Sequence, residues 1–394
     1  MPDRALAELI ASPAELESAF APMDAANRTD GICARGAAQI IRPPGLRVLP
    51  VLLELGKARL SSLVVATAAV GFIVASPAAV AWAQLAWTVL GVGLAALGAN
   101  ALNQWLELAA DGRMRRTCGR PLPARRLDRN TGLAFGMLAG AGGPLLLLVF
   151  VNGLAAALAS ATLIIYVSLY TPLKSRTPAN TLVGAVVGGL PPLIGWAAAT
   201  GGLAPASGVL AAILFTWQVP HFLALAWIYR EDYARGGFRM LPSVDPDGRL
   251  TGLYVVLYSL ALLPLTLLPA MLETAGWMYA AGATMLGALF VFLGVRLERE
   301  RTTAAAWWVF RASVIYLPLL LALLVADRRP APSVSRGLDL KPGWAQVGEV
   351  GGAAALSGQA GQRPVVQDAA SELGRAAVEA RAGSAPEGSF VRPT

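Results

Sequence analysis

Nine apolar runs, each roughly 18 to 25 residues long, make up most of the chain between residues 60 and 326. A helix of this length rises far enough to cross the hydrocarbon layer of a bilayer, which is about 30 Å thick. The sequence therefore predicts an all-α polytopic membrane protein with nine transmembrane helices. The expected helices lie near residues 60–81, 85–109, 131–151, 153–171, 180–200, 207–229, 251–271, 275–295 and 306–326.

The composition agrees with a membrane protein and excludes an ordinary soluble domain. Apolar residues make up 56% of the 394 residues, and charged residues make up only 14%. The formal net charge is +8, and it comes mostly from arginine. In a membrane protein such an excess is typical of cytoplasmic loops, so it does not predict nucleic-acid binding.

Basic residues alternate along the connections between the apolar runs. They precede the first run and follow the second, fourth, sixth and eighth, whereas the connections near 82–84, 152–153 and 201–206 contain no Lys or Arg. Under the positive-inside rule this alternation predicts a cytoplasmic N-terminus and places every polar motif described below on the cytoplasmic side. The expected location is the bacterial cytoplasmic (inner) membrane.

Composition also divides the chain into three parts. Residues 1–45 are of mixed polarity without a clear period, and we expect a flexible N-terminal extension there. Residues 46–328 contain the apolar runs and form the expected transmembrane domain. Residues 329–394 are rich in Ala, Gly, Ser, Pro, Arg and Glu, a composition that favours a disordered tail.

A row of three polar residues, Asn103, Glu107 and Asp111, ends the second apolar run. Their spacing of four places them on one face of a helix. Carboxylates near the hydrocarbon layer are costly and usually face a polar cavity, and their oxygen atoms suit Mg²⁺. The row therefore predicts a magnesium site, although simple pairing with nearby arginines is an alternative, above all for Asp111.

Basic residues that suit phosphate follow this row in two places. The first is a loop that contains Arg113, Arg116 and Arg120, and the second is a short stretch with Lys174 and Arg176. Guanidinium groups bind phosphate oxygens in a two-point manner. We expect both stretches to bind a diphosphate, although ordinary positive loops of a membrane protein are an alternative for each.

Two more polar groups belong to the sixth run and the loop behind it. His221 is the single histidine of the chain, and it lies inside the run. Its neutral imidazole has the chemistry to ligate a haem iron or to move a proton, while a hydrogen-bonded structural role is the alternative. Asp232 follows in the loop, where we expect it to hold a second Mg²⁺ or to complete the first site.

These motifs together resemble those of the UbiA superfamily of intramembrane prenyltransferases. The acidic row with Arg116-Thr-x-x-Arg120-Pro-Leu-Pro behind it is similar to the first motif of the whole superfamily. Other stretches resemble its protohaem IX farnesyltransferase branch, and the similarity covers about residues 50–328. These stretches are Tyr170-Thr-Pro-Leu-Lys174, Asn180-Thr-Leu-Val-Gly184-Ala, Pro191-Pro192-x-Ile-Gly195-Trp196, Gln218-Val-Pro220-His221-Phe222 and Asp232-Tyr-x-x-x-Gly-x-x-Met240-Leu241-Pro242.

The resemblance implies nine helices around a central cavity and transfer of a farnesyl group from farnesyl diphosphate to a vinyl group of protohaem IX (haem B), giving haem O and diphosphate. It implies Mg²⁺ as the cofactor, haem as a substrate, the lipid bilayer as the surroundings and oxidase-assembly or other haem-modifying proteins as partners. Carried over onto this chain, the metal-diphosphate would be held by Asn103, Glu107, Asp111 and Asp232. Phosphate would be bound by Arg113, Arg116, Arg120, Lys174 and Arg176, and the haem would face His221.

The chain departs from the superfamily at two positions. The second acidic motif often has a further Asp where this chain has Gly236, and the haem branch resembles this chain in that loss. Ser175 stands where relatives tend to have a basic residue directly after the lysine, and Arg176 is the expected compensation.

Three other functions stay open at this point. A UbiA-type prenyltransferase with an aromatic or quinone-precursor acceptor would use the same acidic row. A transporter also carries carboxylates inside the membrane, but it places them near the midplane rather than at one face. A haem chaperone without chemistry would need no diphosphate site, so the arginine loop argues against it.

Overall fold

The computed structural model describes residues 48–77 and 79–329, and this part of the chain is helical. The predictions made for residues 1–45 and for the tail beyond residue 329 lie outside the described residues. The helices are α4 (Val48–Leu55), α5 (Ala58–Ala75), α6 (Trp82–Leu106), α7 (Leu108–Asp111), α8 (Arg129–Phe150), α9 (Gly153–Ile164), the π-helix η2 (Ile165–Tyr170), α10 (Thr171–Leu173), α11 (Asn180–Thr200), α12 (Pro205–Ile228), α13 (Arg230–Gly236), α14 (Leu241–Val244), α15 (Arg249–Met271), α16 (Trp277–Glu300) and α17 (Thr303–Ala326).

Nine helical segments of the described chain are long and apolar enough to cross a membrane, as the sequence predicted. The third and fourth are separated by only a tight turn, and Asn152 explains why the chain reverses there. Its side chain accepts a hydrogen bond from the backbone N–H of Ala155 at 2.8 Å and donates one to the backbone oxygen of Ala197 at 2.8 Å. The same residue therefore begins α9 and ties it to α11.

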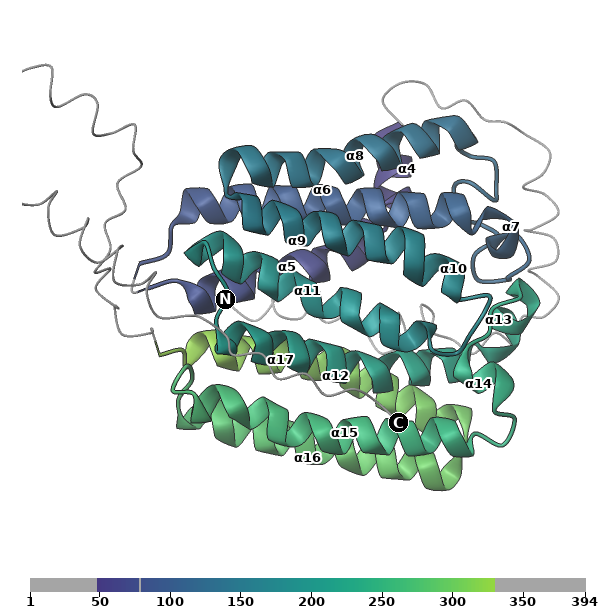
Figure 1. The fold of residues 1–394 in the computed structure, drawn as a ribbon. Helices are drawn as coiled ribbons and strands as arrows, with labels where there is room; N and C mark the ends of the chain where they lie inside the picture. Colours follow the sequence, from purple (N-terminus) through teal and green to yellow (C-terminus); the bar gives the residue numbers. More distant parts are fainter. Residues whose placement is uncertain (1–47, 78, 330–394) are drawn as a thin grey trace, which may run out of the picture. The chain divides into compact units, whose positions relative to one another are not determined.

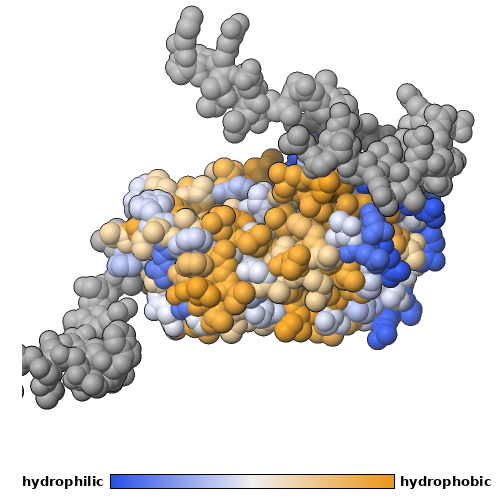
Figure 2. All heavy atoms as spheres, turned by 90° about the horizontal axis from the view of Figure 1, so that it is seen from above, coloured by the Kyte–Doolittle hydropathy of each residue, from blue (hydrophilic) through white to orange (hydrophobic). Residues whose placement is uncertain are grey.

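The long helices lie side by side, and the short helices α7, α10, α13 and α14 gather at one end of them (Figure 1). We call this the polar end and define it by residues 107–128, 174–179 and 229–248. Figure 2 shows one face, on which apolar residues cover most of the middle and hydrophilic residues concentrate at this end. Large apolar side chains on the outside are strongly exposed, for example Leu138 at 76% and Trp277 at 78%, as expected for surfaces in contact with lipid.

Small residues allow two pairs of helices to approach each other closely. A Cβ atom on Gly195 of α11 would lie 1.8 Å from the backbone oxygen of Ala68 in α5. A Cβ atom on Gly98 of α6 would lie 2.1 Å from the backbone nitrogen of Gly140 in α8. Such backbone contact is typical of helix association in membranes. The first contact joins α5 and α11, which are two walls of one cavity, and the second fixes α6, a third wall, against α8.

The fourth span changes to a π-helix, η2, shortly before the polar end. In η2 the rings of Tyr166 and Tyr170 stack with their centroids 5.3 Å apart. The ring of Tyr170 also packs against Gly184 of α11, where a Cβ atom would lie only 2.7 Å from it. Wide turns of this kind occur often at functional sites, and here the turn directs both tyrosines into the cavity and leads the chain to Lys174.

Candidate active site

A cavity of about 370 Å³ lies between α5, α6, α9, η2, α11 and α12. Its inner walls are mostly apolar, while charged and amide side chains line the part nearest the polar end. The polar lining there consists of Lys57, Asn100, Asn103, Glu107, Asp111, Arg116, Arg120, Lys174 and Tyr233. The molecule therefore offers one space that joins an apolar chamber to a charged rim.

The acidic row lines this cavity along its whole length. Asn103 comes from α6 and Asp111 from α7, and Glu107 stands between the two helices with φ −89° and ψ 8°. The three residues are 1%, 7% and 0% exposed, respectively. The spacing of four thus places all three on one wall, although the helix is interrupted at Glu107.

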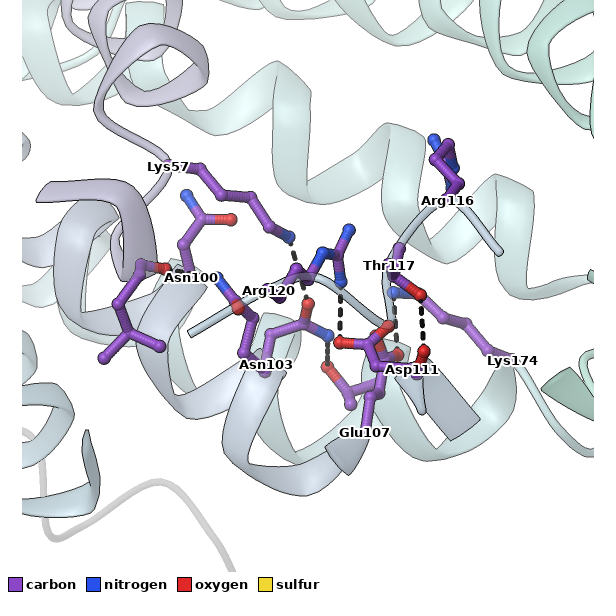
Figure 3. A network of polar contacts seen from close by, with 12 residues as sticks. Lys57, Asn100, Asn103, Glu107, Asp111, Arg116, Thr117, Arg120 and Lys174 are labelled. Carbon is purple, nitrogen blue, oxygen red and sulfur yellow. Dashed lines mark hydrogen bonds and ion pairs between the residues drawn. The ribbon is translucent and has the colours of Figure 1, made fainter. Parts of the chain in front are cut away.

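Three basic side chains reach the acidic row from other segments (Figure 3). Lys174 Nζ lies 2.8 Å from Glu107 Oε1, and Arg120 Nη1 donates to Asp111 Oδ2 at 2.7 Å. Lys57 Nζ donates to Asn103 Oδ1 at 3.3 Å. Arg116 also lines the cavity, but its guanidinium stacks on the rings of Tyr229 and Tyr233 and not on the acidic row. The rim thus contains four basic side chains and two carboxylates, an excess of basic groups.

Burial changes the proton affinity of two groups at this rim. It raises the pKa of the Asp111 carboxyl above its ordinary value, although the Arg120 guanidinium acts in the opposite direction. Burial lowers the pKa of the Lys57 ammonium to about 7, and the positive charges of Arg120 and Lys174 act in the same direction. A bound anion would favour the charged form of Lys57, so the rim is suited to receive negative charge.

Lys57 is a site residue that the sequence marks only as one of the basic residues before the first apolar run. It directly precedes α5 with a φ of 50°, in the left-handed region that few non-glycine residues adopt. This turn between α4 and α5 directs its side chain towards Asn103. The sequence shows only a lysine at the start of an apolar run, one place after Gly56. The positive-inside rule also explains a lysine at such a position, so the sequence alone does not identify Lys57 as a site residue.

The arginine loop divides into residues that line the cavity and residues that hold the loop in place. Arg116 and Arg120 line the cavity, and Arg116 Cζ lies 4.6 Å from the centroid of the Tyr229 ring. Arg113 does not line it, because its Nη2 donates to the backbone oxygen of Gly236 at 3.0 Å. Arg176 is exposed and also lies outside the lining.

Asp232 contacts the arginine loop, and its role in metal binding stays a prediction. Asp232 Oδ1 accepts from the backbone N–H of Arg115 at 2.9 Å, and Oδ2 accepts from that of Arg116 at 3.0 Å. Arg235 Nη2 also donates to Oδ1 at 2.8 Å. Both carboxylate oxygens therefore fasten the arginine loop to α13, and Asp232 is absent from the cavity lining.

His221 likewise lies beside the cavity and not on its wall. Its ring stacks between Trp217 and Phe310, with centroid distances of 4.9 and 5.0 Å. Its Nδ1 lies 2.7 Å from Ser313 Oγ, and this hydroxyl donates to the backbone oxygen of Phe310. Because the Ser313 hydroxyl donates its own hydrogen to Phe310, its oxygen accepts the hydrogen bond from His221. In a neutral imidazole ring the proton therefore lies on Nδ1.

The acidic row fits a magnesium ion by the chemistry of its atoms. Asp111 Oδ1 is buried and has no hydrogen-bond partner among the described residues. Mg²⁺ is usually bound by one or two carboxylates together with substrate phosphates and water. Nowhere in the described ranges do three or more His, Cys, Asp or Glu residues form a possible metal cluster, so a diphosphate and water would have to supply the remaining ligands.

Comparisons with known proteins agree with this geometry. The model of the UbiA prenyltransferase family matches residues 64–317. The protoheme IX farnesyltransferase of Solibacter usitatus (strain Ellin6076) is 46% identical over 285 residues, which cover 70% of this chain and 98% of the relative. The enzyme of the same name from Salinibacter ruber (strain DSM 13855 / M31) is 45% identical over 275 residues, which cover 70% and 97%.

Two solved structures share the fold at 18% sequence identity. One is that of digeranylgeranylglyceryl phosphate synthase, with a TM-score of 0.60 over 71% of this chain and 98% of that chain. The other is the apo structure of a UbiA homolog from Aeropyrum pernix K1, with a TM-score of 0.53 over the same shares. From the family match, the identities and the shared fold it follows that the chain belongs to the UbiA prenyltransferase family.

Proposed function

We propose that this protein transfers a farnesyl group from farnesyl diphosphate to a vinyl group of protohaem IX, giving haem O and diphosphate. The observation that carries the proposal is the cavity itself, in which an apolar chamber ends at a rim with four basic side chains and two carboxylates. The names of the two bacterial relatives support the choice of prenyl donor and acceptor. The proposed setting is the bacterial inner membrane, with the polar end and the N-terminus at the cytoplasm.

Lys174, Arg120 and Lys57 are the proposed ligands of the diphosphate oxygens, because all three point to the same wall of the rim. Asn103, Glu107 and Asp111 would hold Mg²⁺, which when bound neutralises charge on the leaving diphosphate. Arg113, Arg176 and Asp232 are not needed as ligands in this arrangement. Arg113 and Asp232 act at a distance, by holding the arginine loop against α13.

The basic side chains at the rim favour heterolysis of the bond between the allylic carbon and the diphosphate. The apolar walls of the chamber protect the allylic cation that forms. The bond between the allylic carbon and the diphosphate oxygen breaks, and the basic side chains stabilise the electron pair that stays on oxygen. The vinyl group attacks the allylic carbon, and water then adds to the cation beside the porphyrin, giving a hydroxyethylfarnesyl group after loss of a proton. Apolar walls limit premature hydrolysis of the allylic cation.

A purified-protein assay tests this proposal. Detergent-solubilised protein with Mg²⁺, farnesyl diphosphate and protohaem is expected to form a heavier haem, detected by liquid chromatography with mass spectrometry. The alternative is transfer to an aromatic or quinone-precursor acceptor, and the position of His221 away from the cavity wall keeps it open. Unmodified haem together with prenylation of 4-hydroxybenzoate in a parallel reaction would favour that alternative.

Lys57 provides a direct test of the diphosphate site. Replacing it by methionine is expected to weaken binding of inorganic diphosphate by about 10- to 100-fold, because a hydrogen bond to a charged group contributes roughly 1.5–3 kcal/mol. Isothermal titration calorimetry in the presence of Mg²⁺ measures the change. Arg59→Met is the matched control, since Arg59 is exposed and lies outside the lining. Equal affinities of the two variants would contradict a role for Lys57.

A further inference from the structure

The wall that α6 contributes to the cavity changes in character along the helix. Its lining residues, followed away from the polar end, are Asn103, Asn100, Ala99, Ala96, Ala95 and Val92. Steps of three and four residues keep these side chains on one face of the helix. Three alanines therefore separate the polar amides from a valine, and their small side chains leave room along this face.

Packed apolar side chains close the cavity at the end away from the polar end. On α6, α9 and α11 the lining residues farthest from the polar end are Val92, Ala159 and Ile194, and all three are buried. They belong to one hydrophobic cluster together with Phe72 and Leu85, which do not line the cavity. The cavity therefore ends on these three residues, which we call the floor.

Two helices give a similar depth for the space above the floor. Val92 lies eleven residues before Asn103, which corresponds to about 16 Å along the axis of α6. On α11, Ile194 lies ten residues after Gly184, the first lining residue from the polar end, which corresponds to about 15 Å. An extended chain advances about 1.2 Å per bond, so one isoprene unit with four main-chain bonds spans about 5 Å. Three such units span about 15 Å and fit this depth, whereas four units span about 20 Å and exceed it.

We propose that the floor residues Val92, Ala159 and Ile194 select the length of the prenyl donor and limit it to three isoprene units. This inference rests on the proposed function and deepens it by naming the residues that distinguish farnesyl diphosphate from its shorter and longer homologues. With the diphosphate at the charged rim, the chain extends along the alanines of α6 and its last unit contacts the floor. A shorter chain leaves the floor without contact, and a longer chain has to fold back on itself.

Raising the floor tests this selection. Ala96 lies seven residues before Asn103, or about 10 Å along α6, which is the length of about two isoprene units. Ala96→Leu is expected to raise the ratio of kcat/KM for geranyl diphosphate to that for farnesyl diphosphate roughly tenfold or more, because the third unit loses its buried contacts. Detergent-solubilised protein with Mg²⁺, protohaem and each donor in turn gives these values, with the prenylated haem measured by liquid chromatography and mass spectrometry.

Lowering the floor tests the same selection in the opposite direction. Val92→Ala and Ile194→Ala together remove five carbon atoms, as many as one isoprene unit contains. The double variant is expected to raise the ratio of kcat/KM for geranylgeranyl diphosphate to that for farnesyl diphosphate roughly tenfold or more, because the fourth unit gains buried space. The wild-type protein should prefer farnesyl diphosphate to both homologues.

Ala86→Leu is the matched control for Ala96→Leu, because Ala86 belongs to the same helix but is exposed and lies outside the lining. An unchanged preference in Ala96→Leu, an equal change in Ala86→Leu, or loss of activity with both donors in folded Ala96→Leu would overturn the inference. Equal kcat/KM values of the wild-type protein for farnesyl and geranylgeranyl diphosphate would also overturn it. That result is expected if the chain leaves the cavity past Leu60, which lines it and is 66% exposed.

The test does not depend on the recovery of one variant. If Ala96→Leu is not recovered folded, Ala159→Leu decides, since its larger side chain fills the floor itself and should favour geranyl diphosphate in the same way. If the double variant is not recovered folded, the filling variants decide alone. Absence of any prenylated haem with the wild-type protein would overturn the proposed function and the inference with it. Farnesylated haem with the same donor preference in every variant would overturn the inference alone.

Discussion

Replacing Asp111 by asparagine is expected to lower the turnover number by about 100- to 1000-fold, the cost typical of losing one charge-stabilising group in a preorganised site. Asp111 is fully buried, its Oδ2 accepts from Arg120, and its Oδ1 has no hydrogen-bond partner in the described part of the chain. Asparagine keeps the volume but removes the negative charge that would bind Mg²⁺. Initial rates of haem farnesylation over a range of Mg²⁺ concentrations measure the effect.

Glu107→Gln should behave in the same way, because Glu107 is the second carboxylate of the row and is 7% exposed. Glu54→Gln serves as the control, since Glu54 pairs with Arg126 outside the cavity lining. We expect that control to keep nearly full activity. Activity within threefold of wild type in both Asp111→Asn and Glu107→Gln would remove the acidic row from the mechanism.

Asp232→Ala is expected to have the second largest effect, through the arginine loop and not through the metal. The substitution removes the acceptor of the backbone N–H groups of Arg115 and Arg116, and hydrogen bonds to a charged group contribute roughly 1.5–3 kcal/mol each. We expect a lower thermal midpoint and a loss of about 10- to 100-fold in kcat/KM for farnesyl diphosphate. The Mg²⁺ concentration at half-maximal activity should stay the same.

Arg235→Gln tests the ion pair at Asp232 alone, because it removes Arg235 and keeps the hydrogen bonds between Asp232 and the arginine loop. Arg235 is 39% exposed, and such a pair contributes about 0–1 kcal/mol, so this variant should resemble wild type. A higher Mg²⁺ requirement in Asp232→Ala, with unchanged thermal stability, would instead identify Asp232 as a metal ligand. The two results are distinguishable in one set of titrations and melting curves.

The acidic row illustrates what local spacing can predict. Residues four apart share a helix face, and Asn103, Glu107 and Asp111 do line the same cavity wall. This shared face is kept although the backbone departs from regular helix at Glu107, with φ −89° and ψ 8°. The nine spans were predictable for a related reason, since the length and polarity of a segment decide whether it can cross lipid.

His221 and Asp232 illustrate where such reasoning stops. Periodicity shows that Gln218 and Phe222 share a face of α12, but it does not tell which face meets the cavity. In the fold α17 packs beside His221. Ser313 forms a hydrogen bond with the His221 ring, and the Phe310 ring stacks on it. Asp232 likewise accepts hydrogen bonds from backbone groups of a loop more than a hundred residues away in the sequence. No pattern near Asp232 predicts that contact.

Membrane insertion, the helical class and the order of acidic groups on α6 and α7 were decided within short stretches of sequence, because hydropathy and helix pitch act locally. Which cations meet those acids was decided only by tertiary packing. Lys57, Arg120 and Lys174 reach one rim because close helix contacts, such as that between Gly195 and Ala68, bring distant segments together. Charge–charge contact depends on distance in space, which spacing along the chain does not specify.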